Sequence, residues 1–297
     1  IIDCMRDQSR VKVFVARRWF RTLPPYFVAL IAAAFLFKAN GFDILLYTVF
    51  AQDILPNLPT ENFYPVAWSL AVEEWYYVLF TGLIVVVGLK AHRPLETAIA
   101  FILVLQVAKV VAFAWMSPEF VRTSTFLRLD AIACGFVAYH IVNRGVSMPI
   151  VVGCLIFSGI SVSYIAAAII ESHSESGLFR LLFIEASMVF GSSIVMVAAR
   201  LGSVWRSQGT PYFLAVWFGR ISYSVYLFHL IIYVLLSGSL PLTLMQEFAL
   251  YLALLFAFTI PFYLMFEAPI LMIRPKYAKV SDLDLHPRFS PEIGRLR

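Results

Sequence analysis

Long apolar stretches alternate with short polar segments along almost the whole chain. Each stretch approaches the roughly 20 helical residues needed to cross a hydrocarbon core of about 30 Å. The pattern therefore predicts an all-α fold, a polytopic bundle of transmembrane helices. The eight predicted spans are residues 24–39, 64–89, 96–116, 126–143, 149–170, 179–199, 212–236 and 245–273.

Two segments depart from the simple alternation. Residues 42–55 are apolar but too interrupted to cross a membrane, so they predict a short re-entrant or interfacial helix. The first span opens with Pro24 and Pro25, which suit a helix start because the first turn needs no N–H donor. The chain divides into a membrane domain, residues 1–276, and a polar cytoplasmic tail, residues 277–297.

The composition agrees with a membrane protein. Hydrophobic residues make up 61% of the 297 residues and charged residues only 14%, against about 25% in an average soluble domain. This composition excludes intrinsic disorder and argues against a soluble globule, so the lipid bilayer is the predicted surroundings. The three cysteines show no metal-ligand spacing, and no metal is predicted.

The distribution of basic residues predicts the orientation. The net charge is +5, but the basic residues lie in short runs between spans, so no nucleic-acid partner is predicted. If the N-terminus is cytoplasmic, most of the 23 Lys and Arg residues fall on the cytoplasmic side. This bias follows the positive-inside rule, and both ends of the chain are predicted to be cytoplasmic.

The first candidate site is a basic cluster beside the first span, Arg17-Arg18-Trp19-Phe20-Arg21. Arg18 and Arg21 are three residues apart, so they share a helix face. Guanidinium groups form paired hydrogen bonds with phosphate, which suits a phosphate-bearing ligand. The alternative is a topology anchor that binds anionic lipid headgroups.

The second candidate is a pair of adjacent carboxylates, Glu73 and Glu74, in an otherwise apolar helix. Ionisable residues inside a span are costly and are functional candidates by default. Neighbouring helical residues point about 100° apart, so the two carboxylates cannot serve one partner equally. Ser69 and Glu73 share a face with Tyr76 or Tyr77. The alternative is a solvated helix N-terminus favoured by the helix dipole.

The third candidate is the pair Arg128 and Asp130. Residues two apart on a helix do not face each other, so each is expected to find its own partner on a neighbouring helix. The alternative is a purely structural interhelical ion pair. Lys109, His140 and Glu185 occur singly in the sequence and are interpreted as structural.

The fourth candidate is a polar stripe on one helix face, formed by Ser222, Tyr226, His229 and Tyr233. Such a stripe should face the bundle interior or a wet cavity. His229 is interpreted as a proton-transfer group, a hydrogen-bond donor to substrate, or a satisfied core histidine.

The last candidate is Glu267, which precedes a predicted break in the final span. Pro269 has no N–H for the carbonyl of Met265, so the helix should kink or end there. The alternative for Glu267 is a carboxylate at a fraying helix end.

Five motifs in this order resemble the acyltransferase 3 family of integral membrane O-acyltransferases. The resemblance covers about residues 10–273. The motifs are Arg17–Pro24, Trp68–Tyr76, Arg128–Asp130 with Gly135, Ile221–His229 and Glu267–Pro269.

The resemblance implies a complete protein of about ten transmembrane helices. Members of the family move an acyl group, often acetyl from cytoplasmic acetyl-CoA, to a hydroxyl of a sugar or cell-surface glycan. An acyl-CoA co-substrate, a carbohydrate or lipid-linked glycan acceptor and a bacterial inner membrane are therefore expected. The family's catalytic histidine lies in its first transmembrane helix, which this sequence does not contain. The chain is interpreted as N-terminally truncated, and His229 is not assigned as the base.

The resemblance also assigns expected roles to residues. Arg18 and Arg21 are expected to bind the donor phosphates. A second set is expected to shape the acceptor pocket or to support it: Trp68, Glu73, Glu74, Arg128, Asp130, Ser222, Tyr226, His229 and Glu267. Two alternatives remain, a proton-coupled membrane transporter, because interior Glu, Arg and His residues also serve proton coupling, and an inactive fragment of the acyltransferase.

Overall fold

A computed structural model describes residues 8–275 apart from 57, 60, 84–92, 173–176, 205–209 and 238–242. All regular structure in this part of the chain is helical. The predicted all-α fold is therefore confirmed. The predicted tail, residues 277–297, lies outside the described residues.

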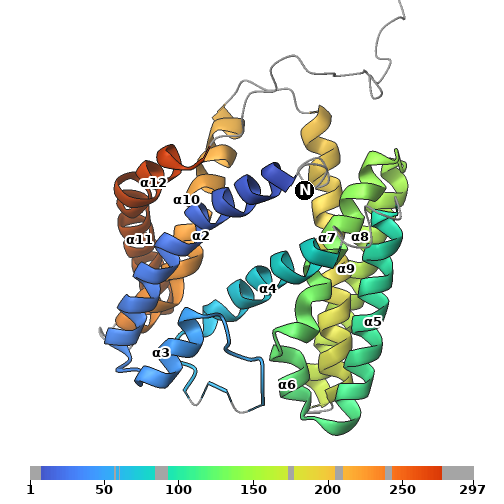
Figure 1. The fold of residues 1–297 in the computed structure, drawn as a ribbon, viewed down its shortest axis with the longest axis horizontal. Coiled ribbons are helices and arrows are strands. Elements are labelled where there is room, and N and C mark those ends of the chain that lie inside the picture. The colour runs from blue at the N-terminus through green and yellow to red at the C-terminus, as the bar shows by residue number, and fades with distance from the viewer. Residues whose placement is uncertain are drawn as a thin grey trace, which may run out of the picture.

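The helices form two groups joined by one oblique helix (Figure 1). The first group contains α2 (Gln8–Leu36), α3 (Gly41–Thr48), α10 (Thr210–Leu236), α11 (Leu244–Phe262), the π-helical turn η4 (Tyr263–Glu267) and α12 (Ala268–Ile273). The second group contains α5 (Pro94–Trp115), α6 (Pro118–Thr123), the 3-10 turn η3 (Phe126–Arg128), α7 (Leu129–Asn143), α8 (Met148–Ser172) and α9 (Gly177–Val204). The short turn η1 (Pro65–Ala67) contacts α10, and α4 (Trp68–Leu83) continues from it to α7.

Seven helices in the described part of the chain are long and apolar enough to cross a membrane. They cover Val13–Leu36, Pro94–Trp115, Phe126–Asn143, Met148–Ile169, Leu181–Leu201, Tyr212–Leu236 and Leu244–Ile273. The chain is therefore an integral membrane protein with a polytopic helix bundle. The predicted span 64–89 corresponds to α4, which has 16 described residues, and its remaining residues lie outside the described part.

The first span differs from its prediction. Pro24 and Pro25 lie inside α2, not at its start. Two consecutive prolines remove only two backbone hydrogen bonds of the helix, those to the carbonyls four residues earlier. The turns before the prolines are held by α4, because Trp19 and Thr22 both donate to the Glu74 carboxylate. Tertiary contacts therefore extend the helix through a sequence that favours a helix start.

The predicted short helix within residues 42–55 is confirmed as α3. The Asn40 side chain caps it by accepting a hydrogen bond from the backbone N–H of Asp43, 2.8 Å away. After α3 the chain turns sharply, with positive φ at Phe50 and Asp53. Gln52 between them is fully buried and donates to the carbonyl of Ala67 at 3.1 Å. This loop is thereby fixed against the start of α4.

The first half of α2 lies against the C-terminal end of the described chain. The Arg17 guanidinium donates to the carbonyl of Pro275, with 2.7 Å between Nη1 and O. Seven crossings alone would place Arg17 and Pro275 on opposite sides of a bilayer. The oblique α4 lies between the first group and the start of α5 (Figure 1), so we expect it to provide a further crossing, as the predicted span 64–89 requires. Which side is cytoplasmic stays a prediction.

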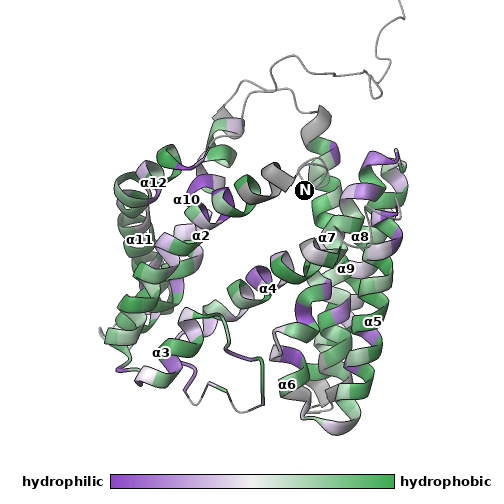
Figure 2. Ribbon diagram, viewed as in Figure 1, coloured by the Kyte–Doolittle hydropathy of each residue, from purple (hydrophilic) through white to green (hydrophobic). Residues whose placement is uncertain are grey.

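Apolar side chains cover the outside of the long helices, as expected in lipid. Phe157 of α8 is 75% exposed, and Val107 of α5 is 64% exposed. Helices α8 and α9 approach closely, because Gly159 leaves room for the ring of Phe190. Hydrophilic residues appear instead on α4 and on nearby parts of α2 and α10 (Figure 2). These three helices position the candidate site.

Candidate functional site

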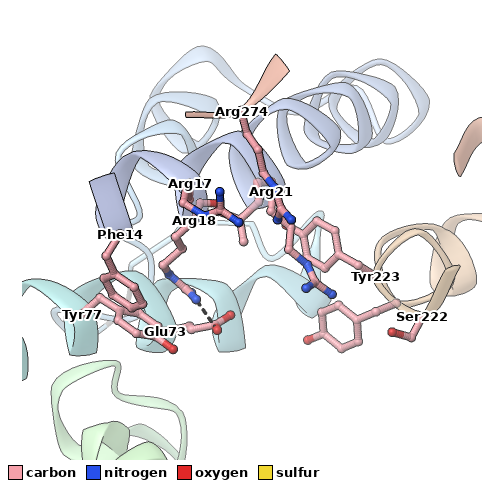
Figure 3. A pocket seen from close by; sticks show the side chains of 11 residues that line it. Phe14, Arg17, Arg18, Arg21, Glu73, Tyr77, Ser222, Tyr223 and Arg274 are labelled. Atoms are coloured by element: carbon pink, nitrogen blue, oxygen red, sulfur yellow. Dashed lines mark hydrogen bonds and ion pairs between the residues drawn. The ribbon is translucent and has the colours of Figure 1, made fainter. Parts of the chain in front are cut away.

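A cavity of about 500 Å³ opens at the end of the first helix group where α2 begins. We call it the basic cavity. Figure 3 shows its side chains converging from α2, α4, α10 and the segment after α12. Its lining residues are Phe14, Arg17, Arg18, Arg21, Thr22, Glu73, Tyr77, Ser222, Tyr223, Tyr226 and Arg274. The predicted helix face with Arg18 and Arg21 is therefore confirmed, as is the shared face of Glu73 and Tyr77.

Arg18 is held firmly by the protein itself. Its Nη2 lies 2.7 Å from Glu73 Oε1 and 3.5 Å from Glu74 Oε1. Its guanidinium carbon lies 3.5 Å from the centroid of the Tyr77 ring, a cation–π contact. The two carboxylates serve Arg18 unequally, as their directions on the helix predicted. Arg18 therefore organises the wall of the cavity and has little charge left for a ligand.

Arg21 and Arg274 differ from Arg18 in their side-chain contacts. Neither guanidinium has a hydrogen bond or an ion pair with the residues that the structure describes. Glu267 lies close enough to Arg21 to act on it electrostatically. Two cations that line a cavity without a direct partner are suited to bind an anion that enters from outside.

Glu74 connects α2 to α4. Its carboxylate accepts hydrogen bonds from Trp19 Nε1 at 3.1 Å and from Thr22 Oγ1 at 3.4 Å, besides its contact with Arg18. The residue is only 9% exposed. Glu74 therefore fixes the helix that carries the arginines, whereas Glu73 faces the cavity.

The polar stripe of α10 runs along two cavities. Ser222 and Tyr226 line the basic cavity, while Tyr226 and His229 line a second one. Tyr233, also predicted in this stripe, is 50% exposed and contacts the ring of Tyr251 instead. The stripe thus faces cavities over its first two turns, as predicted, and leaves them at Tyr233.

The second cavity, of about 690 Å³, lies at the seam between the two helix groups. We call it the seam cavity. Part of its polar lining comes from loops and helix ends, and Ser187, Tyr226 and His229 lie within α9 and α10. The lining residues are Asp53, Asn62, Pro65, Val66, Trp68, Arg122, Thr123, Arg128, Phe183, Ile184, Ser187, Met188, Tyr226 and His229. An aromatic ring among hydrogen-bonding groups is a lining that suits a hydroxyl-rich ligand.

His229 lines this cavity, and one of its ring nitrogens is bonded within α10. Its Nδ1 lies 2.7 Å from the backbone carbonyl of Tyr226, which accepts hydrogen bonds only. Nδ1 must therefore carry the hydrogen, and in the neutral imidazole Nε2 is left with a free lone pair. Such a nitrogen accepts a hydrogen bond from a hydroxyl, rather than donating one to it.

Asp53 was not predicted and is the acidic residue of the seam cavity. Burial raises the pKa of its carboxyl from 3.8 to about 6, and the charge of Arg122 lowers that pKa in part. Its backbone is fixed on both sides, because its N–H donates to Leu58 and its carbonyl accepts from Thr125. A carboxyl that titrates near neutral pH can exchange a proton with a ligand.

Arg128 and Asp130 find separate partners, as predicted. Arg128 faces the Trp68 ring, with 5.4 Å between the guanidinium carbon and the ring centroid, and lines the seam cavity. Asp130 is fully buried and accepts from Lys109 at 2.5 Å. Lys109 also donates to Glu185 at 2.6 Å.

Lys109 and Glu185 occur singly in the sequence, but in the fold they are not isolated. Gln106 donates to Asp130 at 2.7 Å and to Glu185 at 2.9 Å, which completes a network across α5, α7 and α9. We call Gln106, Lys109, Asp130 and Glu185 the ion cluster. It lines neither the basic cavity nor the seam cavity. The contacts within the ion cluster join helices that are far apart in the sequence, and no local sequence pattern predicts such pairing.

Glu267 lies inside the bundle, not at a fraying end. It is 4% exposed, and its carboxylate accepts a hydrogen bond from Ser224 of α10. The predicted break before Pro269 is present as the π-helical turn η4, which precedes α12. The wider turn leaves Glu267 directed at α10, so this carboxylate connects the two helices.

No protein-family model, curated protein or solved structure matches the chain. The acyltransferase 3 resemblance therefore rests on the five motifs. Within the described residues, no three His, Cys, Asp or Glu side chains gather in a way that could hold a metal.

Several lining residues escaped the sequence analysis. Arg274 lies just after the last span, where a basic residue is ordinarily a topology signal. Tyr223 lies between stripe positions, and its hydroxyl donates to the Thr22 carbonyl at 2.8 Å. The one signal in the sequence was that Arg274 follows shortly after the kink at Pro269. Such a kink can direct the Arg274 side chain back toward α2.

Proposed function

We propose that the protein is a membrane O-acyltransferase that takes an acyl group, acetyl in the simplest case, from a cytoplasmic acyl-CoA. The acceptor would be a hydroxyl of a sugar or cell-surface glycan, and the membrane a bacterial inner membrane. The observation that carries this proposal is the pair of arginines in the basic cavity, Arg21 and Arg274, which have no direct partner among the residues that the structure describes. The pyrophosphate and 3′-phosphate of CoA are anions that such guanidiniums bind in a bidentate manner.

The remaining geometry supports the proposal in two ways. Arg18, held by Glu73 and Tyr77, ties α2 to α4, so the helix face that carries Arg21 is fixed at the cavity. The seam cavity offers Trp68 for stacking on a sugar ring and the His229 Nε2 lone pair for a hydroxyl. The basic cavity would then hold the donor and the seam cavity the acceptor.

The chemistry requires a base for the acceptor proton and hydrogen-bond donors for the developing oxyanion. We assign neither role to a residue of this chain. The residues named above would bind and orient the two substrates. Bringing two reactants together in the right geometry lowers the barrier substantially by itself.

The test is acetyl transfer in membranes that carry the protein encoded by the complete reading frame. Arg21→Ala is expected to raise the KM for acetyl-CoA by roughly 10- to 100-fold, the typical effect of losing charge-assisted hydrogen bonds. Arg144→Ala, which removes an exposed arginine after α7, is the matched control and should change nothing. An unchanged KM in Arg21→Ala would remove the donor-binding role.

A proton-coupled transporter is the second candidate, and the ion cluster favours it. One lysine and two carboxylates in a membrane interior are groups that transporters use to carry protons. The transporter would replace the acyltransferase under two results. The first is that acetyl transfer is absent already in the unchanged protein, so that Arg21→Ala has nothing to remove. The second is that Glu185→Gln abolishes pH-driven uptake of substrate into vesicles. An inactive fragment would show neither activity.

A further inference from the structure

Tyr226 lines both the basic cavity and the seam cavity. On the same helix face, Ser222 lies one turn before it and lines the basic cavity, and His229 lies about one turn after it and lines the seam cavity. The two cavities therefore meet along α10 at a single level of the bundle. The basic cavity opens beside Arg17, and the seam cavity lies among loops at the other end, so the two approach this level from opposite sides.

Hydrogen bonds close the bundle at this level. The Tyr226 hydroxyl donates to the Val66 carbonyl at 2.7 Å and pairs with the Ser69 hydroxyl. Because the Tyr226 hydrogen is used on Val66, the Ser69 hydroxyl donates to the Tyr226 oxygen in this arrangement. Both partners belong to η1 and α4, so α10 is tied to α4 between the cavities. We call Tyr226, Ser69 and the Val66 carbonyl the partition.

We infer that the two cavities are halves of one polar path through the bundle, closed at the Tyr226 hydroxyl and opened when that side chain swings away. The inference stands on this geometry and does not require the proposed function. If the proposed function holds, the partition is the place where an acyl group passes from the donor side to the acceptor side.

The partition is built from few groups and can open at low cost. A single neutral hydrogen bond adds little net stability, because water replaces the lost partner, and both cavities have polar side chains among their lining residues. The Tyr226 ring is only partly buried, and its neighbour His229 bonds to its backbone, not to its hydroxyl. Rotation of the side chain therefore leaves the helix hydrogen bonds of α10 and the bond from His229 to the Tyr226 backbone in place, and it gives up the contact between the Tyr226 and His229 rings, whose centroids lie 5.8 Å apart.

The experiment measures from which side a cysteine in each cavity can be modified. The three native cysteines are replaced, and Ser222→Cys or Ser187→Cys then places one thiol in the basic or the seam cavity, respectively. Sealed vesicles of each orientation are treated with an anionic, membrane-impermeant methanethiosulfonate, since the arginines of both cavities attract anions. With Tyr226 intact, each thiol should react from one side only, and the two thiols from opposite sides.

Changes at Tyr226 should then remove this sidedness. Tyr226→Phe keeps the ring but loses both hydroxyl contacts, so modification of the Ser222→Cys thiol from the far side should rise roughly fivefold. Tyr226→Ala should produce the larger rise, and Tyr233→Ala, which truncates a tyrosine of the same helix outside both cavities, should produce none.

Two results would overturn the inference. One is modification of either thiol at equal rates from both sides while Tyr226 is present. The other is unchanged one-sided modification in both Tyr226→Phe and Tyr226→Ala, with elution on size exclusion like that of the unchanged protein. If Tyr226→Ala elutes as aggregate, Tyr226→Phe decides. Because this readout needs no acyl donor, its failure is distinct from failure of the proposed function.

Discussion

Lys109 in the second helix group and Arg21 with Arg274 at the first group have opposite surroundings. In the second group, Lys109 is 1% exposed and lies within 2.6 Å of two carboxylates, with Gln106 bonded to the same pair. In the first group, Arg21 and Arg274 line an open cavity and have no direct partner among the described residues. A charge whose partners are all internal holds helices together. A charge that faces a cavity without such partners is available to a ligand.

The comparison predicts different consequences for removing a cation from each group. Loss of a cation from the ion cluster should damage stability, because carboxylates are left buried without compensation. Loss of Arg21 or Arg274 from the basic cavity should leave stability intact and damage binding. The predictions below test this contrast, beginning with the largest expected effect.

Lys109→Met is expected to lower the free energy of unfolding by about 3–5 kcal/mol, the usual cost of breaking a buried ion pair from one side. Chemical unfolding in detergent micelles measures it. The triple variant with Asp130→Asn and Glu185→Gln should recover most of the loss, because no uncompensated charge remains. Lys38→Met, at an exposed lysine after α2, is the control. If Lys109→Met were as stable as this control, the ion cluster would not hold α5, α7 and α9 together.

Ser224→Ala removes a hydroxyl that donates to the buried Glu267 carboxylate. The expected loss is about 1–3 kcal/mol, because the carboxylate keeps its burial but loses a hydrogen bond. Ser222→Ala is the matched control, since within the described part of the chain its exposed hydroxyl bonds only to the Gly219 carbonyl of its own helix. Equal stability of the two variants would contradict the role of Glu267 as a connection between η4 and α10.

Asp53→Asn should change how stability depends on pH. The folded-state pKa of about 6 lies above the ordinary 3.8, so the folded protein holds this proton more tightly than the unfolded chain does. The contribution of the Asp53 carboxyl to the free energy of unfolding is therefore fully present below about pH 4. It is lost as the pH rises through 6. Since the side chain is partly exposed, we expect roughly 1 kcal/mol.

The comparison for this prediction is the slope of unfolding free energy between pH 4 and 6. The unchanged protein should lose stability over this range, and Asp53→Asn should lose less. Parallel curves for the two proteins would show that the carboxyl is not buried in the way the structure indicates.

The sequence predicted those features that depend on local periodicity. Membrane spans follow from apolar length, and the shared faces of Arg18 with Arg21 and of Glu73 with Tyr77 follow from helix geometry. The kink before Pro269 follows from the missing N–H. Each of these needs information from only a few neighbouring residues.

Other features depend on contacts between distant segments. Lys109 looks isolated in the sequence because its partners Asp130 and Glu185 lie on other helices. Arg274 resembles a topology signal until the last helix returns to the start of α2. Asp53 enters the seam cavity through a loop with positive φ, a conformation that a non-glycine residue adopts only where tertiary contacts fix it.

The central claim is that the basic cavity binds the phosphates of an acyl donor through Arg21 and Arg274. Its most direct test is the affinity of CoA for the purified protein, measured by calorimetry alongside Arg21→Ala, Arg274→Ala and Arg144→Ala. We predict that the first two variants bind CoA roughly 10- to 100-fold more weakly at unchanged stability, and that Arg144→Ala binds it as the unchanged protein does. Equal affinity in all four proteins, or no CoA binding by the unchanged protein, would contradict the claim.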